Sequence, residues 1–190
     1  MVAKTLTKWA WEHGRNDLSL KYNFLTAIER NKRFWEQRRP IMTQVARVQS
    51  AEFIETGLAQ QKFINGLRHA MLSVLAVPIY SEALHPTSDL QGLVTLPVEE
   101  TLTEFWNTER AEIILVKSLT QDVSELRRVS QINTTNIVVT AAVSGNFLAA
   151  DTIIYPCFPG IITGKQVNAE TGTIFSAKLE FKELFLDWTL

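Results

Sequence analysis

The sequence AEIILVKSLTQDVSELRRVSQINTTNIVVT, residues 111–140, lies at the centre of the stretch that decides the fold. It alternates segments rich in Val, Ile, Thr and Leu with turn residues, and the same pattern extends over residues 90–162. Strands are predicted at 93–98, 111–117, 124–131, 136–140, 152–155 and 160–163. No helical crossover lies between them, so this stretch predicts a small barrel or sandwich and not a parallel sheet.

The flanking segments predict a second unit around this stretch. A strand-like pattern covers 42–56, and apolar residues then recur at helical spacing through 58–75. The apolar positions of this helix are Phe63, Ile64, Leu67, Met71, Leu72 and Leu75. Residues 173–184 alternate again, and a half-buried strand there needs a sheet to join. The sheet that begins at 42–56 is the available one.

These patterns together predict an α+β fold that is mainly β. Its main part is a β-sandwich-like domain with one main helix, which is interrupted by an inserted small β-barrel-like module and completed by a C-terminal strand. The expected division is an N-terminal arm at 1–35, a discontinuous domain at 36–89 plus 164–190, and the inserted module at 90–163.

Composition narrows the class of protein. The apolar fraction of 46% is that of a folded domain, and a net charge of -1 gives no general attraction to nucleic acid or anionic lipid. Apolar runs are too short to cross a bilayer, and residues near the N-terminus lack the pattern of a secretory signal. One cysteine, Cys157, allows no internal disulfide, which fits a reducing compartment such as a host cytoplasm.

Region 1–35 is rich in aromatic residues but has no regular pattern of its own. Its aromatics must be buried elsewhere, either on the parent domain or on a neighbouring subunit. Basic residues cluster around aromatics at 30–39, a pattern that also suits single-stranded nucleic acid. Glu29 and Glu36 lie in this cluster, which favours a charged interface segment. The candidate subunit-interface residues are Trp9, Trp11, Arg33, Phe34, Trp35, Arg38 and Arg39.

The search for catalytic or metal-binding patterns is negative. His13, His69 and His85 are far apart, and no cluster has the spacing of zinc ligands. The segment GIITGKQ at 160–166 lacks the spacing and the hydroxyl of a phosphate loop. Glu99 and Glu100 are best explained as solvated acids. We therefore predict no catalytic residue, no metal, no cofactor and no enzymatic activity.

The order of several pieces resembles a known family. Glu36-Gln37-Arg38, an extended stretch, an amphipathic helix and Val77-Pro78-Ile79-Tyr80 follow one another, then a small β-module with Phe105 and Trp106, and finally the strand near 173–181. This order is similar to that of tail-tip and distal tail proteins of long-tailed bacteriophages, over residues 36–183. Tyr80 stands where that group commonly has Trp.

The resemblance implies a structural virion protein at the distal end of the tail, assembled in the host cytoplasm. Such a protein forms a ring of identical copies in the baseplate or tail tip and connects the tail tube protein to hub or receptor-binding proteins. The resemblance carries no catalytic residue, nucleic-acid specificity or membrane insertion.

Two alternatives come from other classes of protein. A carbohydrate-binding protein for host recognition would use an exposed ridge of aromatics, chosen from Phe105, Trp106, Phe147, Tyr155 and Phe158. A single-stranded nucleic-acid binder built on a small barrel would show salt-sensitive binding.

Overall fold

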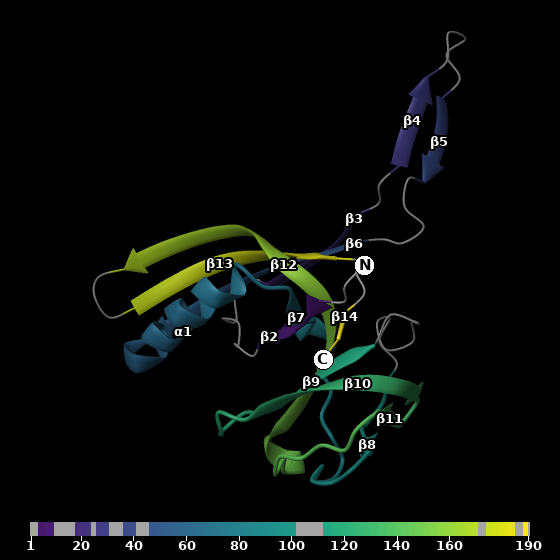
Figure 1. The fold of residues 1–190 in the computed structure, drawn as a ribbon, viewed down its shortest axis with the longest axis vertical. Coiled ribbons are helices and arrows are strands. Elements are labelled where there is room, and N and C mark those ends of the chain that lie inside the picture. Colours follow the sequence, from purple (N-terminus) through teal and green to yellow (C-terminus); the bar gives the residue numbers. More distant parts are fainter. Residues whose placement is uncertain are drawn as a thin grey trace.

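The computed structural model describes residues 4–9, 18–23, 26–30, 36–40, 46–101, 112–170, 174–184 and 188–189. In these ranges the chain is mostly β-strand with one α-helix (Figure 1), so the prediction of a mainly β fold is confirmed. The strands are β1 (Lys4–Thr5), β2 (Thr7–Lys8), β3 (Leu18–Asn23), β4 (Thr26–Arg30), β5 (Glu36–Pro40), β6 (Ala46–Thr56), β7 (Leu75–Pro78), β8 (Thr95–Pro97), β9 (Ile113–Ser118), β10 (Ser124–Asn133), β11 (Asn136–Val139), β12 (Thr152–Glu170), β13 (Ile174–Glu183) and β14 (Trp188–Thr189). The helix is α1 (Gly57–Ala70), and two 3-10 turns are η1 (Tyr80–Glu82) and η2 (Ala149–Asp151).

Ten of these strands form one mixed sheet, in the order β3-β6-β13-β12-β9-β10-β11-β8, with β7 beside β12 and β2 beside β7. β13 pairs antiparallel with β6 from Ile174 opposite Thr56 to Lys182 opposite Val48. Phe175, Ala177, Leu179 and Phe181 on β13 are buried, and the polar residues between them face outward. The prediction that the C-terminal strand joins the sheet begun near residues 42–56 is therefore confirmed.

Strand β12 differs from its prediction. Two short strands at 152–155 and 160–163 were expected, but β12 is one strand of 19 residues from Thr152 to Glu170. It pairs with β9 over 152–157 and with β13 over 160–170, while β7 occupies its other edge over 157–160. Proline supplies no N–H to a ladder, and both Pro156 and Pro159 lie where the strand changes partners. The expected boundary between residues 163 and 164 falls inside this strand.

The buried side chains of the described residues form two clusters, and strand β9 contributes one face to each of them. The first core contains α1, β6 and β13 residues, and the second core lies between Leu84 and Ile154. On β9, Ile113 and Leu115 belong to the first core, whereas Ile114 and Val116 belong to the second. A strand buried on both faces has a continuous apolar sequence, which explains the run in AEIILV.

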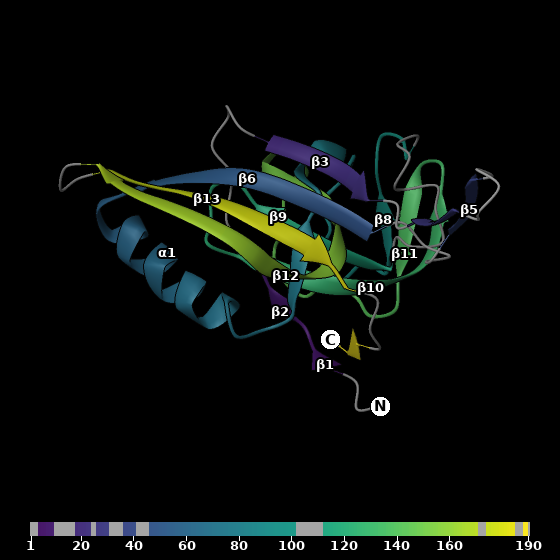
Figure 2. The ribbon, with the colours of Figure 1, turned by 90° about the horizontal axis from the view of Figure 1, so that it is seen from above.

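Helix α1 lies beside β12 and β13 (Figure 2) and buries Phe63, Leu67 and Ala70 in the first core. The predicted helix continued to residue 75, with Met71 and Leu72 on its apolar face. That part of the prediction is wrong, because the helix ends at Ala70 and both side chains are exposed. The Ser73 hydroxyl donates to the His69 carbonyl at 3.0 Å, and the chain turns so that Val74 and Leu75 enter the core instead.

Residues near the N-terminus belong to the main sheet. β2 pairs parallel with β7, and β3 pairs with β6, and both strands lie within the region 1–35 that was predicted to be an N-terminal arm. Trp9 is only 1% exposed and meets Phe53, Phe63 and Phe181 edge-on, with ring centroids 5.4–5.9 Å apart. The aromatics of this region were predicted to be buried either on the parent domain or on a neighbouring subunit. Trp9 is buried on its own chain.

Candidate functional site

The predicted interface residues fall in different parts of the structure. Arg38 and Arg39 lie in β5, which pairs antiparallel with β4, opposite Ile28 and Ala27 respectively. Trp9 is a residue of the first core, so its indole has no surface to offer a neighbouring subunit. Trp11, Arg33, Phe34 and Trp35 lie outside the described residues. The structure thus places Trp9 in the first core and Arg38 and Arg39 in β5.

The β4–β5 hairpin is a small sheet of its own. Among the described strands, β4 and β5 pair only with each other, and the hairpin stands away from both cores (Figure 1). An isolated two-stranded hairpin is marginally stable in water, because it lacks a packed face. A contact with another molecule would supply that face, which makes this hairpin the candidate assembly element.

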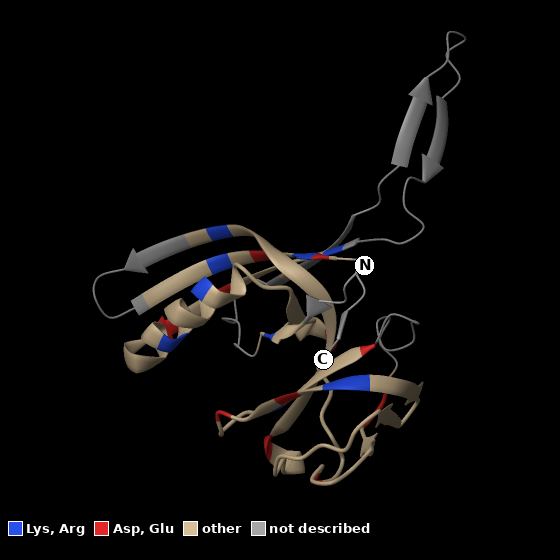
Figure 3. Ribbon diagram, viewed as in Figure 1, with Lys and Arg blue, Asp and Glu red and all other residues tan. Residues whose placement is uncertain are grey.

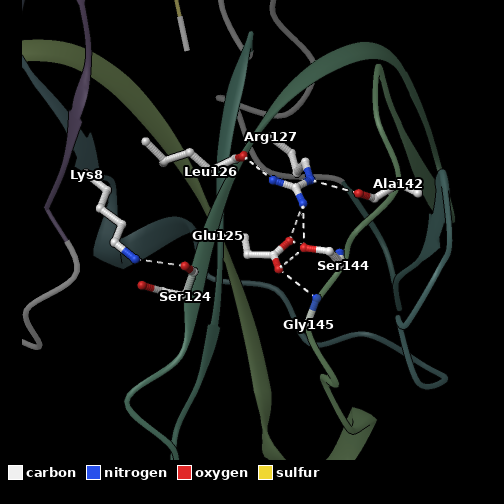
Figure 4. Close-up of polar contacts among 8 residues, drawn as sticks. All are labelled: Lys8, Ser124, Glu125, Leu126, Arg127, Ala142, Ser144 and Gly145. Atoms are coloured by element: carbon white, nitrogen blue, oxygen red, sulfur yellow. Dashed lines mark hydrogen bonds and ion pairs between the residues drawn. The ribbon is translucent and has the colours of Figure 1, made fainter.

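A polar cluster fixes one loop of the second core to β10 (Figure 4). The Glu125 carboxylate accepts hydrogen bonds from the Ser144 hydroxyl at 2.6 Å and from the Ser144 and Gly145 backbone N–H groups at 3.1 and 2.6 Å. The Arg127 guanidinium pairs with the same carboxylate and donates to the Ala142 carbonyl at 3.1 Å. A Cβ on Gly145 would lie 2.6 Å from the Phe147 ring, so the loop needs glycine there.

This arrangement stabilises the charged form of Glu125. Burial alone would raise the pKa of Glu125, but the hydrogen bonds from Ser144 and Gly145 and the nearby Arg127 charge outweigh burial and lower it. Charge-assisted hydrogen bonds of this kind are stronger than neutral ones. The cluster is therefore a structural clamp on the loop at 141–147.

We expect Glu125→Gln to lower the free energy of unfolding by about 1–3 kcal/mol at pH 7. Because the folded pKa is lowered, this contribution is present above the unfolded pKa near 4.5 and is lost as the pH falls through the folded value. Urea unfolding at pH 7 and at pH 3 measures the free energy of unfolding above and below the unfolded pKa. Glu112→Gln, an exposed position, is the control and should change little. An equal loss for Glu125→Gln at both pH values would contradict a charged clamp.

Lys8 connects β2 to β10. Its ammonium donates to the Ser124 carbonyl at 2.9 Å, next to the Glu125 clamp (Figure 4). β2 itself pairs with β7 in the first core. This short strand thus contacts both halves of the sheet.

The described residues contain no candidate metal site. Among them, no group of three or more His, Cys, Asp or Glu is close enough to hold a metal ion. His69 is exposed on α1, the His85 ring lies 3.2 Å from the Thr152 carbonyl, and His13 is outside the described ranges. Burial raises the pKa of the Cys157 thiol far above its ordinary value. This thiol is therefore a core group and not an activated nucleophile.

We expect Cys157 to resist alkylation in the folded protein. Iodoacetamide reacts with thiolate, and the thiol is both fully buried and held protonated by its apolar surroundings. Labelling followed by mass spectrometry should show reaction only in urea concentrations that unfold the chain. Rapid labelling at pH 8 without urea would contradict the placement of this residue in the first core.

Two exposed apolar groups were missed by the sequence predictions. Met71 and Leu72 were assigned to a buried helix face, although Ser73 is a signal for a helix end. The others are Leu119, Val123 and Leu148, which lie in turns of the second-core region. Turn residues have no periodicity, so the sequence alone does not separate an exposed leucine from a buried one.

In comparisons with known proteins, no protein family matches this chain and no curated protein matches it significantly. Within the described ranges, α1 is too short and too polar to cross a membrane.

Proposed function

We propose that the chain is a structural virion protein of a bacteriophage tail. In this proposal it forms a ring at the distal tail tip or baseplate and connects the tail tube to hub or receptor-binding proteins. The observation that carries the proposal is the β4–β5 hairpin, whose strands pair only with each other among the described strands. The Gln37-Arg38 pair, part of the family resemblance, lies in this hairpin.

The finer architecture belongs to the same proposal. We interpret the first core with α1 as a β-sandwich-like domain, and the second core as an inserted small barrel-like module. Two separate buried clusters and the pairing of β13 with β6 support this interpretation.

Permanent ring contacts bury more than about 2,000 Å² and are rich in aromatic residues and arginine. Residues 30–39 combine both kinds of side chain, since Phe34 and Trp35 lie between basic residues in the sequence. A subunit that contributes this hairpin to its neighbour makes a head-to-tail contact, which closes into a ring when its rotation closes.

Replacing residues 26–40 by a Gly-Ser linker tests the proposal. We expect the variant to retain its free energy of unfolding, since β4 and β5 pair only with each other among the described strands. Light scattering and negative-stain images should show closed rings for the parent chain and smaller species for the variant. Arg38→Ala/Arg39→Ala should weaken assembly, whereas the matched Lys178→Ala/Lys182→Ala on the outer sheet face should not.

The location in the virion needs a separate measurement. Gold-labelled antibodies against the chain should bind the far end of the tail in phage particles that carry it. Rings formed normally without residues 26–40 would exclude the hairpin contact, and label elsewhere on the particle would exclude the proposed function.

The carbohydrate-binding alternative receives less support. Phe147, Tyr155 and Phe158 are at most 5% exposed, so they cannot form a binding ridge. Phe105 and Trp106 lie outside the described residues.

A further inference from the structure

An apolar surface with basic neighbours lies where α1 ends. Leu72 is 92% exposed and Met71 is 45% exposed, and Arg68 and His69 in the last helical turn are exposed beside them. The Lys165 ammonium on β12 lies 3.6 Å from the Met71 sulfur. We name these five residues the α1-end patch. Its permanently charged side chains, Arg68 and Lys165, are basic.

A second apolar surface has acidic neighbours. The turn between β9 and β10 exposes Leu119 and Val123, and it is hydrogen-bonded to the segment that carries Leu148. The Leu119 N–H donates to the Asp151 carbonyl at 2.8 Å, and the Ser118 hydroxyl donates to the Asp151 carboxylate at 2.7 Å. With Asp122 on the same turn, these residues form what we name the turn patch: Leu119, Asp122, Val123, Leu148 and Asp151.

The two patches are complementary in charge and alike in apolar character. Figure 3 shows basic segments on α1 and the adjoining part of β12, and acidic segments at the β9–β10 turn and η2. Asp122 already pairs with Lys62 of its own chain at 3.4 Å, but both side chains are well exposed, at 96% and 68%. Exposed pairs of this kind contribute little, so Asp122 can exchange its partner at small cost.

We propose that the α1-end patch of one copy docks on the turn patch of the next copy. The patches lie on different elements, one at the end of α1 and one at the β9–β10 turn, so the contact is heterologous and repeats from copy to copy. Exposed apolar side chains on both patches, with basic neighbours on one and acidic neighbours on the other, give the composition of a specific interface. The inference rests on the proposed function only in that it supplies a contact of the ring.

A mixing experiment with two variants tests the head-to-tail contact. Leu72→Ser damages the α1-end patch and leaves the turn patch intact, whereas Leu119→Ser does the reverse. Each variant alone should associate at least about tenfold more weakly than the parent chain, because truncating a central interface residue removes much of its binding energy. An equimolar mixture holds one intact patch of each kind and should form one-to-one pairs of the two variants that grow no further through this contact.

Sedimentation velocity over a range of concentrations measures these species. Leu58→Ser is the matched control, since Leu58 is 79% exposed on the same helix but lies outside both patches. It should assemble like the parent chain. Lys165→Glu should weaken association, while Lys182→Glu on the outer face of β13 should not.

Three outcomes would overturn the inference. They are a parent chain that stays monomeric at every concentration, single variants that assemble like the parent, and a variant mixture that stays monomeric. Rings that survive both leucine substitutions would refute the patches and leave the tail-tip function intact. Head-to-tail dimers from a protein that antibodies do not find on tails would refute the function and leave the patches intact.

Discussion

Replacing Trp9 by alanine should lower the free energy of unfolding by about 3–5 kcal/mol, the range for large aromatic residues removed from a core. The indole is 1% exposed and packs against three phenylalanines that come from β6, α1 and β13. Its removal leaves a cavity at the point where these elements meet. Urea unfolding followed by circular dichroism measures the change.

Two variants make this prediction specific. Trp9→Phe keeps an aromatic ring and removes an indole N–H that has no hydrogen-bond partner among the described residues, so it should cost less than alanine. Leu58→Ala, on the exposed side of α1, should stay within about 0.5 kcal/mol of the parent chain. A Trp9→Ala variant as stable as Leu58→Ala would contradict the burial of Trp9.

Replacing Glu183 by alanine should cost about 3–5 kcal/mol, as expected when one partner of a buried ion pair is removed. The Glu183 carboxylate accepts from the Arg47 backbone N–H at 2.8 Å and from its guanidinium at 3.3 Å, and both side chains are 4% exposed. The variant leaves the Arg47 guanidinium buried without that carboxylate. Urea unfolding at pH 7 again provides the measurement.

The double variant Arg47→Met/Glu183→Leu tests whether the stability depends on the ion pair itself or only on two buried side chains at these positions. Replacing both partners by apolar groups of similar size removes the desolvation cost together with the attraction. We expect the double variant to lose less stability than Glu183→Ala alone. A double variant that loses the sum of both single effects would show that the two side chains act independently.

The spacing of apolar residues was sufficient to predict the elements that bury one face. The alternation of Phe175, Ala177, Leu179 and Phe181 predicted β13 and its sheet, and helical spacing predicted the core face of α1 with Phe63 and Leu67. Elements that change surroundings along their length were not predictable in this way. β12 passes from one neighbour to another, and its two prolines have the same signature as a turn.

The candidate assembly surfaces were predictable only in part. The composition at 30–39 indicated an interface segment, and the structure describes Arg38 and Arg39 within a hairpin. Tryptophan is common both at interfaces and in cores. The sequence therefore did not show that Trp9 lies in a core, which depends on tertiary packing. The exposure of Leu72 follows from the helix end at Ala70, and helix boundaries are weakly encoded in local sequence.

The pairing of β13 with β6 also sets an order of events during synthesis. All described members of the second core lie between Leu84 and Ile154, so that core can close once this segment has left the ribosome. The first core cannot close until Phe175 and Phe181 arrive, although Phe53 and Phe63 were made long before. Pairings distant in sequence form slowly and leave apolar surface open to aggregation meanwhile. A nascent chain stalled near residue 170 would thus hold one finished core and one open row of aromatics, the state on which a chaperone would act.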